Sequence, residues 1–352
     1  MSKQLNVGRR VAALVVLLVV PLGQSPPSAA KEPVPIIFDT DMGNDVDDAL
    51  ALAMLHALQS RGECRLLAVT VSKDNRLAAA FVDATNRFYG RGEIPVGLVR
   101  DGATKDAGKF LQLAEERDGR ELRFPHRFSD GSLPPPAVDV LRKTLAGQAD
   151  DSVSIVQVGF STNLARLLDS APDDISPLPG RELVKQKVRL LSVMGGWFSP
   201  DRLTQEPPGA EYNIVEDVAA AQRLARDWPT PIVWSGFEVG RAIEYPAESI
   251  DNDFAYVAHH PIAEAYRLYN PPPHNRPAWD LTSALYALRP ARGYFDVSPP
   301  GRVTISDDGR TTFVAASDGR HRLLTVTADQ VTRAREAFVN FCSEPPPSDR
   351  ND

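Results

Sequence analysis

The sequence is poor in cysteine. Only Cys64 and Cys342 occur among its 352 residues, and they lie far apart. Two distant cysteines cannot form a Cys-rich zinc cluster or the dense disulfide framework of a small secreted scaffold. A single disulfide between them is compatible with an exported protein, but we expect two buried structural thiols instead.

Long apolar runs are also scarce, and the one prominent run is Val11–Val20. Three basic residues precede it, and the small residues 28–30 follow it. This order is typical of a secretory signal peptide, here residues 1–30 with cleavage after Ala30. The run is too short for an ordinary membrane span, although an uncleaved anchor is the alternative. We therefore expect an exported protein, periplasmic or secreted, with no stable membrane span after cleavage.

An excess of basic charge is absent as well. The formal charge is -7, and removing residues 1–30 takes away three positive charges and no negative ones, which gives -7 - 3 = -10. An acidic chain argues against nucleic acid as a partner. We find no internal repeat and no low-complexity domain. We assign residues 33–343 to a single domain and the Pro- and charge-rich residues 344–352 to a disordered tail.

Apolar strand-like runs alternate with helical segments, which is typical of an α/β fold. We expect strands at 34–38, 66–71, 154–158, 188–194 and 232–234, and helices at 49–58, 77–89, 163–168, 215–225 and 281–288. The pattern predicts a Rossmann-like open, mostly parallel sheet flanked by helices. Gly-containing turns between residues 303 and 327 predict a small antiparallel addition near the C-terminus.

Five carboxylates lie close together after the first expected strand: Asp39, Asp41, Asp45, Asp47 and Asp48. They stand between a strand and a helix, where open α/β sheets place their ligands. Like charges this close raise one another's pKa unless a cation lies among them. Ca²⁺ and Mg²⁺ bind oxygen ligands. The cluster therefore predicts a metal or sugar-diol site.

Other interpretations of this cluster fit less well. Helix capping explains some of the acids but not those on the strand side. An EF-hand loop would need Gly and Glu at its sixth and twelfth positions, which hold Asn44 and Leu50 when counted from Asp39. A phosphatase of the haloacid-dehalogenase type, with Asp39 as nucleophile and Asp41 as acid/base, is a distant alternative because Gly43 departs from its usual pattern.

Four further motifs follow in order along the chain. They are a strand-to-helix turn at 158–164, Gly195-Gly196 after a strand, Glu211-Tyr212-Asn213 in a loop, and Trp279-Asp280 at a helix start. Together with the aspartate motif, this order resembles the inosine-uridine-type nucleoside hydrolases, from about residue 36 to about residue 289. The resemblance implies an enzyme that hydrolyses the N-glycosidic bond of ribonucleosides to ribose and free base.

The resemblance also implies a calcium site. By position, Asp41, Asp48, Asp280 and the backbone carbonyl of Val158 are the expected ligands of Ca²⁺. Asp41 is in addition the expected catalytic residue, a general base that takes a proton from a Ca²⁺-bound water. The partner is then a small-molecule nucleoside, and a homo-oligomer is possible because members of the family usually assemble.

The remaining candidates are substrate-binding residues, Asp47, Asp74, Asn75, Glu211, Asn213 and Trp279, and supporting residues, Asp39 and Asp45. Asp74 and Asn75 are both named because an ungapped alignment and a one-residue slip place different side chains at the family's position. The aspartate motif is two residues longer than the commonest family form, so Asp45 competes with Asp47 for one role.

Trp279 is the main departure from the family pattern. Members active on purine and pyrimidine nucleosides carry His there, to protonate the leaving base, and an indole N–H can only donate a hydrogen bond. Trp279 could stack on a base or pack in the core, as could Trp197 and Phe198. His274 is the nearest replacement acid. Two alternatives therefore stay open: a hydrolase of another N-ribosyl compound, and a metal-dependent ribosyl-binding protein without turnover.

Overall fold

The computed structural model describes residues 32–204 and 209–347. The chain from Glu32 onward forms one compact unit. The expected signal peptide and residues 348–352 of the expected tail lie outside the described residues. Among the described helices, none is both long and apolar enough to cross a membrane.

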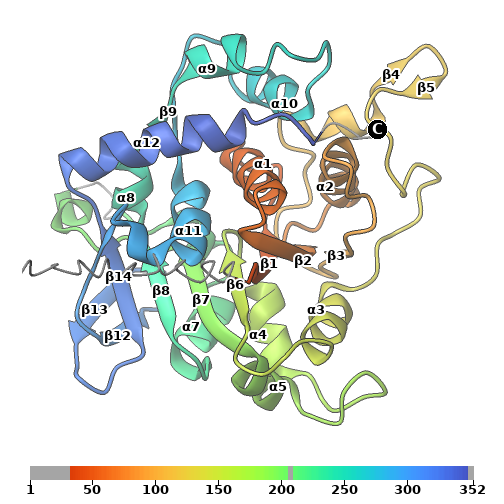
Figure 1. Cartoon of the computed structure of the whole chain (residues 1–352). Helices are drawn as coiled ribbons and strands as arrows, with labels where there is room; N and C mark the ends of the chain where they lie inside the picture. The colour runs from red at the N-terminus through yellow and green to blue at the C-terminus, as the bar shows by residue number, and fades with distance from the viewer. Residues whose placement is uncertain (1–31, 205–208, 348–352) are drawn as a thin grey trace, which may run out of the picture. The chain divides into compact units, whose positions relative to one another are not determined.

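One large sheet organises this unit, with the strand order β13-β12-β14-β8-β7-β6-β1-β2-β3 and β11 beside β14 (Figure 1). Its strands are β1 (Val34–Thr40), β2 (Cys64–Val71), β3 (Val96–Leu98), β6 (Val153–Gln157), β7 (Val188–Met194), β8 (Ile232–Ser235), β11 (Asp296–Val297), β12 (Gly301–Ile305), β13 (Thr311–Ala315) and β14 (His321–Thr325). Every neighbouring pair from β3 across to β14 is parallel. β11, β12 and β13 pair antiparallel. The predicted open, mostly parallel sheet with an antiparallel C-terminal addition is confirmed.

Helices cover both faces of the sheet (Figure 1). One face carries α1 (Asp47–Ser60), α2 (Arg76–Phe88), α10 (Pro261–Tyr269), α11 (Trp279–Leu288) and α12 (Ala328–Cys342); the other carries α3 (Ala137–Ala146), α4 (Thr162–Asp169), α5 (Gly180–Lys187) and α7 (Val218–Asp227). Shorter elements are α6 (Tyr212–Val215), α8 (Phe237–Ala242), α9 (Ala247–Asn252) and the strand pairs β4–β5 (Arg117–Asp118, Glu121–Leu122) and β9–β10 (Glu244–Tyr245, Arg276–Pro277). α1 is buried from Asp47 to Leu58, as expected for a helix that is apolar almost all round.

The two cysteines flank α1 as free, buried thiols. The Cys64 Sγ lies 3.5 Å from the carbonyl oxygen of Leu55, and the Cys342 Sγ lies 3.3 Å from that of Leu50. The expectation of two structural thiols is confirmed.

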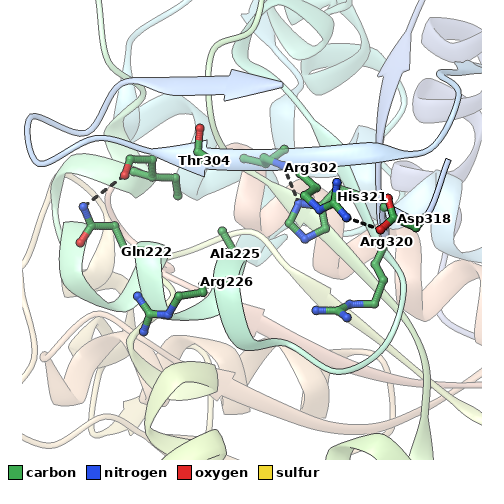
Figure 2. A pocket seen from close by; sticks show the side chains of 11 residues that line it. Gln222, Ala225, Arg226, Arg302, Thr304, Asp318, Arg320 and His321 are labelled. Carbon is green, nitrogen blue, oxygen red and sulfur yellow. Dashed lines mark hydrogen bonds and ion pairs between the residues drawn. The ribbon is translucent and has the colours of Figure 1, made fainter. Parts of the chain in front are cut away.

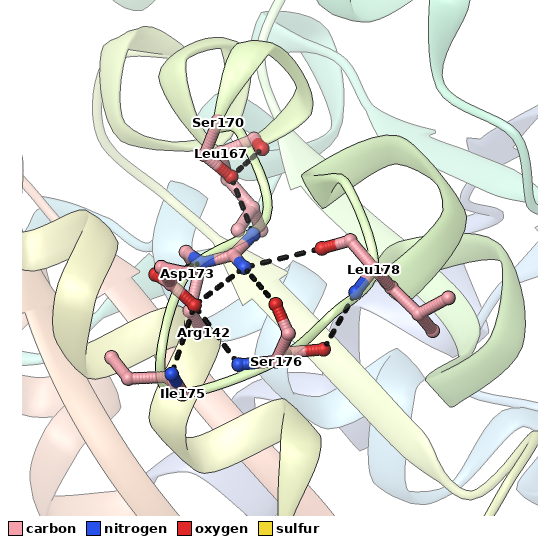
Figure 3. Close-up of polar contacts among 7 residues, drawn as sticks. All are labelled: Arg142, Leu167, Ser170, Asp173, Ile175, Ser176 and Leu178. Carbon is pink, nitrogen blue, oxygen red and sulfur yellow. Dashed lines mark hydrogen bonds and ion pairs between the residues drawn. The ribbon is translucent and has the colours of Figure 1, made fainter.

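A buried arginine anchors the loop between α4 and α5 (Figure 3). Arg142 of α3 is 1% exposed, and its Nε and Nη2 donate to the two carboxylate oxygens of Asp173 at 2.7 and 2.8 Å. Its guanidinium also donates to the Ser170 hydroxyl and to the carbonyl oxygens of Ser176 and Leu178. These contacts satisfy the buried guanidinium itself and tie it to a loop that is otherwise mostly exposed.

The carboxyl ends of the central strands meet where the chain order reverses, with β2 on one side of β1 and β6 on the other. Gly159, directly after β6, makes this approach possible. A Cβ at that position would lie 2.4 Å from the backbone nitrogen of Asp41. The missing side chain therefore lets the end of β6 pack against the loop that follows β1.

Candidate active site

A cavity of about 460 Å³ opens at these carboxyl ends. Buried carboxylates and aromatic rings are the two main kinds of side chain in its lining. Of the residues predicted from sequence, it is lined by Asp41, Asp45, Asp47, Asp48, Val158, Glu211, Asn213, Trp279 and Asp280. Segments far apart in the chain thus converge on one cavity.

Three carboxylates form the tightest group in this cavity. Asp47 and Asp48 lie in the first turn of α1, and Asp280 lies in the first turn of α11. One oxygen of each lies within 4.8 Å of the others. The backbone N–H of Asp280 donates to Asp47 at 3.1 Å, and the Thr40 hydroxyl donates to Asp48. The group thus includes Asp47, which we had assigned to ribose binding.

Burial raises the pKa of Asp47, Asp48 and Asp280 well above the ordinary value, and their neighbouring carboxylates raise it further. Burial likewise raises the pKa of Asp41 to about 6, against a lowering hydrogen bond from Asn44. Such a group ionises readily only when a cation compensates its charge. Buried oxygen ligands converging on one point suit a hard divalent cation, so these residues fit a metal ion.

Lys73 connects the end of β2 to this cluster. Its side chain is fully buried, and its Nζ donates to Asn44 Oδ1 at 2.6 Å. Asn44 in turn donates from Nδ2 to Asp41 Oδ2 at 2.7 Å. These two hydrogen bonds fix the Oδ2 atom of Asp41, and the Lys73 ammonium places a positive charge near the acids.

Asp74 and Asn75 follow Lys73 but lie outside the cavity lining of the described chain. Asp74 accepts a hydrogen bond from the backbone N–H of Gly102 at 3.1 Å. Asn75 caps α2 by accepting from the N–H of Leu77 at 2.9 Å. Both side chains therefore have structural partners in this conformation.

Glu211 and Asn213 organise the opposite part of the site. The Glu211 carboxylate accepts from the backbone N–H groups of Asn213, Gly196 and Ile214, at 2.8, 3.0 and 3.2 Å. Burial nevertheless raises the pKa of Glu211 to about 7. Asn213 Nδ2 donates to the Val158 carbonyl at 2.6 Å, which ties this loop to the end of β6.

The two residues predicted to support the site have different partners. Asp39 is fully buried outside the cavity lining, where Thr70 and Asn163 donate to its Oδ1 at 2.5 and 2.8 Å. Burial raises its pKa to about 7. Asp45 lines the cavity and pairs with Arg276, whose Nε lies 2.9 Å from Asp45 Oδ1. In the competition between Asp45 and Asp47, it is Asp47 that joins the group of three carboxylates.

Aromatic rings form the other wall. Phe237 stacks on Trp279 with ring centroids 5.5 Å apart, and Trp197 packs on Phe237 at 4.5 Å. The Trp279 Nε1 donates to the Phe237 carbonyl at 2.9 Å. Trp197 lines the cavity, whereas Phe198 packs against Trp234. Of the three rings suggested for stacking on a base, Trp279 and Trp197 line the cavity.

His274 does not contribute to the described lining of this cavity. Its ring stacks on Tyr266 with centroids 4.8 Å apart, and burial lowers its pKa. No other histidine of the chain is among the lining residues either, and all six histidines belong to the described residues.

A second hollow, of about 600 Å³, lies between α7 and the strands β12 and β14 (Figure 2). Arg226, Arg302, Arg320 and Asp318 are among its lining residues. Asp318 is exposed and paired with Arg302. None of the site residues predicted from sequence is among the described residues that line this hollow, whereas many of them line the acidic cavity, which is therefore the candidate active site.

Comparison with known proteins identifies the family of this chain. The model of the family described as inosine-uridine preferring nucleoside hydrolase matches residues 36–340. The chain belongs to this family. The resemblance inferred from the motifs is thus confirmed over most of the domain.

The relatives of this nucleoside hydrolase family member differ in how similar they are to it in sequence and in fold. The pyrimidine-specific ribonucleoside hydrolase RihA of Citrobacter koseri is 30% identical over 224 residues, which cover 62% of this chain and 64% of the relative. The match thus spans a little under two thirds of that relative. An inosine-uridine preferring nucleoside hydrolase from Bacillus anthracis has a TM-score of 0.65 at 19% identity, covering 88% of this chain and 99% of that one. The effector XopQ, solved with adenosine diphosphate ribose, has a TM-score of 0.64 at 15% identity, covering 90% and 96%. Both structures share the fold.

Sequence reasoning missed several residues of the site. The cavity is also lined by Arg276, Tyr269, Phe237 and Met194. Lys73 contacts the lining residue Asn44 through a hydrogen bond. A signal for Arg276 was present, because a basic residue close before the last metal-type Asp complements an acidic cluster. Phe237 and Tyr269 gave no such signal, since aromatic residues near helix ends are common in any core.

Proposed function

We propose that this protein hydrolyses the N-glycosidic bond of ribonucleosides and releases ribose and free base. The observation that carries the proposal is one cavity that joins buried carboxylates to stacked aromatic rings, in a chain of the nucleoside hydrolase family. Carboxylates suit the sugar and its developing positive charge, and aromatic faces suit a planar base.

The metal in this proposal is Ca²⁺, held by Asp47, Asp48 and Asp280 together with Asp41 and the Val158 carbonyl. When bound there, Ca²⁺ would act as a Lewis acid that lowers the pKa of a water and orients sugar hydroxyls. The support from the structure is the oxygen-only donor set and the burial of the three grouped acids.

Asp41 is the proposed general base. Its carboxylate lines the cavity beside the three grouped acids, where it can take a proton from a water. Asn44 orients the carboxylate through one oxygen and leaves the other for a water. Glu211 and Asn213 are proposed to bind ribose hydroxyls from the opposite loop.

A second candidate function keeps the sugar site and changes the rest of the ligand. It is favoured by Trp279, which stands where a proton donor is expected and whose N–H is already bonded to Phe237. A compound such as adenosine diphosphate ribose, which XopQ binds, represents this class. Such a ligand could be turned over or only bound.

We test the first function by measuring ribose release from a panel of nucleosides, with pyrimidine ribosides first because RihA is pyrimidine-specific. The purified protein without residues 1–30 is assayed with chelator, and then with Ca²⁺ restored. Release that stops with chelator and returns with Ca²⁺ supports the proposal. Absence of release from every nucleoside, with Ca²⁺ bound, would leave the second candidate.

Two further points are proposals as well. The signal-peptide pattern of residues 1–30 supports action outside the cytoplasm, in a periplasm or as a secreted protein. Family membership supports a homo-oligomer. Fractionation of cells that express the full chain, and the mass of the purified protein in solution, test these points directly.

A further inference from the structure

The described lining of the cavity offers the departing base no imidazole and no free indole N–H. No histidine lines it among the described residues, and the Trp279 indole N–H is bonded to the Phe237 carbonyl. The Trp197 indole N–H is likewise bonded, to the Ser199 hydroxyl at 2.9 Å. If this is a nucleoside hydrolase, another group must stabilise the base as its bond to the sugar breaks.

Arg276 is the one cation among the described residues that line the cavity. It lies on β10, and its guanidinium carbon is 4.9 Å from the centroid of the Tyr269 ring and 5.1 Å from that of the Trp279 ring. The aromatic rings therefore present the guanidinium beside the wall on which a base would stack.

The guanidinium is also held in place. Its Nε and Nη2 donate to the two oxygens of Asp45, and Nη2 donates to the Tyr269 hydroxyl at 3.0 Å. Within residues 32–204 and 209–347, Nη1 donates to no protein group. An arginine carries five N–H donors, so the fixed guanidinium retains the two on Nη1.

We propose that Arg276 is the catalytic residue that stabilises the leaving base, an inference that rests on the proposed function. The C1′–N bond breaks with its electron pair on the base, while a water oxygen bonds to C1′ and the water's proton passes to Asp41. The negative charge spreads to an oxygen or ring nitrogen of the base, where the Nη1 donors meet it. Arg276 keeps its own proton, and the base is protonated by solvent after it leaves.

The test compares two ribosides that need different help. Uridine leaves as a poorly stabilised anion, whereas p-nitrophenyl β-ribofuranoside releases p-nitrophenolate, which is stable as an anion near neutral pH. Arg276→Met should lower kcat/KM for uridine by about 10²–10³-fold, the usual effect of removing one such donor. The loss on the p-nitrophenyl riboside should stay below about tenfold. Arg276→Lys keeps the positive charge but lacks the planar guanidinium with its paired N–H donors. It should recover part of the uridine activity.

A matched control is Arg241→Met. Arg241 also lies near Phe237, at 5.9 Å from the ring centroid, but it does not line the described cavity. It should leave both rates unchanged. Retained turnover of the p-nitrophenyl riboside shows in the same assay that Arg276→Met is folded.

Equal losses on both ribosides in Arg276→Met would overturn the proposal, because a residue that only holds Asp45 or the fold affects every substrate alike. A wild-type protein that hydrolyses neither riboside would instead overturn the proposed function, and this inference with it. The two failures are thus distinguished by the activity of the unmutated protein.

Discussion

Asp41 shows how a single residue combines accessibility and burial. Its side chain lines the cavity although the residue is only 4% exposed, and one of its oxygens is held by Asn44. A carboxylate in this position can contact a water in the cavity while it stays shielded from bulk solvent. It is therefore suited to take a proton rather than to act as a surface charge.

We predict that Asp41→Asn lowers nucleoside turnover by about 10²–10⁴-fold, because the amide cannot accept a proton as a base. The measurement is ribose release at saturating Ca²⁺. The exposed Asp318→Asn serves as the control and should keep wild-type activity. Removing one charge from a crowded acidic cluster should not lower the melting temperature in chelator. An Asp41→Asn protein with full turnover would eliminate Asp41 as the base.

At the scale of elements, the site depends on close packing between strand ends. Gly159 allows the end of β6 to approach the backbone nitrogen of Asp41. We predict that Gly159→Ala pushes these segments apart, costs about 1–3 kcal/mol in the free energy of unfolding and weakens Ca²⁺ binding about tenfold. Urea denaturation and calcium titration calorimetry measure the two effects.

Gly147→Ala is the matched control for that variant. A Cβ there would lie no closer than 3.7 Å to its nearest neighbour, the carbonyl oxygen of Thr144. Its stability should stay within about 0.5 kcal/mol of the wild type. Unchanged calcium affinity in Gly159→Ala would show that the approach of β6 to the Asp41 loop is dispensable for the metal.

The Arg142 fork belongs to the same scale, since one side chain holds a whole connection between α4 and α5 (Figure 3). We predict that Arg142→Met lowers the free energy of unfolding by about 1–3 kcal/mol, because the buried carbonyl oxygen of Ser176 loses its donor. Urea denaturation of the variant tests this. Arg302→Met, which removes an exposed ion pair, should cost less than about 1 kcal/mol. Similar costs for the two variants would contradict the role given to burial.

Elements and acids were predictable from the sequence to different degrees. The strands and the aspartate motif follow from local patterns, because apolar runs and clustered charges are visible without any contact. The pairing of Asp45 with Arg276 spans 231 positions in sequence and could not be found locally. Nor could the choice of Asp47 over Asp45 for the group of three, since it depends on which face of the first turn of α1 meets Asp280.

At the scale of the whole molecule, the buried acids link stability to pH. Burial raises the pKa of Asp41 to about 6 and those of Asp39 and Glu211 to about 7. Their ordinary values are 3.8 and 4.5. A raised pKa in the folded state means that stability is fully present below the unfolded value and is lost as pH rises through the folded one.

We therefore predict that the melting temperature in chelator falls between about pH 5 and about pH 8. Added Ca²⁺ should raise it, and by more at the higher pH, because the metal binds ionised carboxylates and binds the folded state. Thermal unfolding at both pH values, with and without Ca²⁺, is the measurement. A melting temperature in chelator that rises with pH over this range would contradict the prediction.

The aromatic wall has a consequence for detection. The chain has four tryptophans, and Trp197 and Trp279 line the cavity, whereas Trp228 and Trp234 are fully buried outside the described lining. Half of the tryptophans therefore lie where a base would stack. Occupation of the cavity should change the emission of these two and leave the other two as a constant background, so the protein carries its own optical reporter of ligand binding.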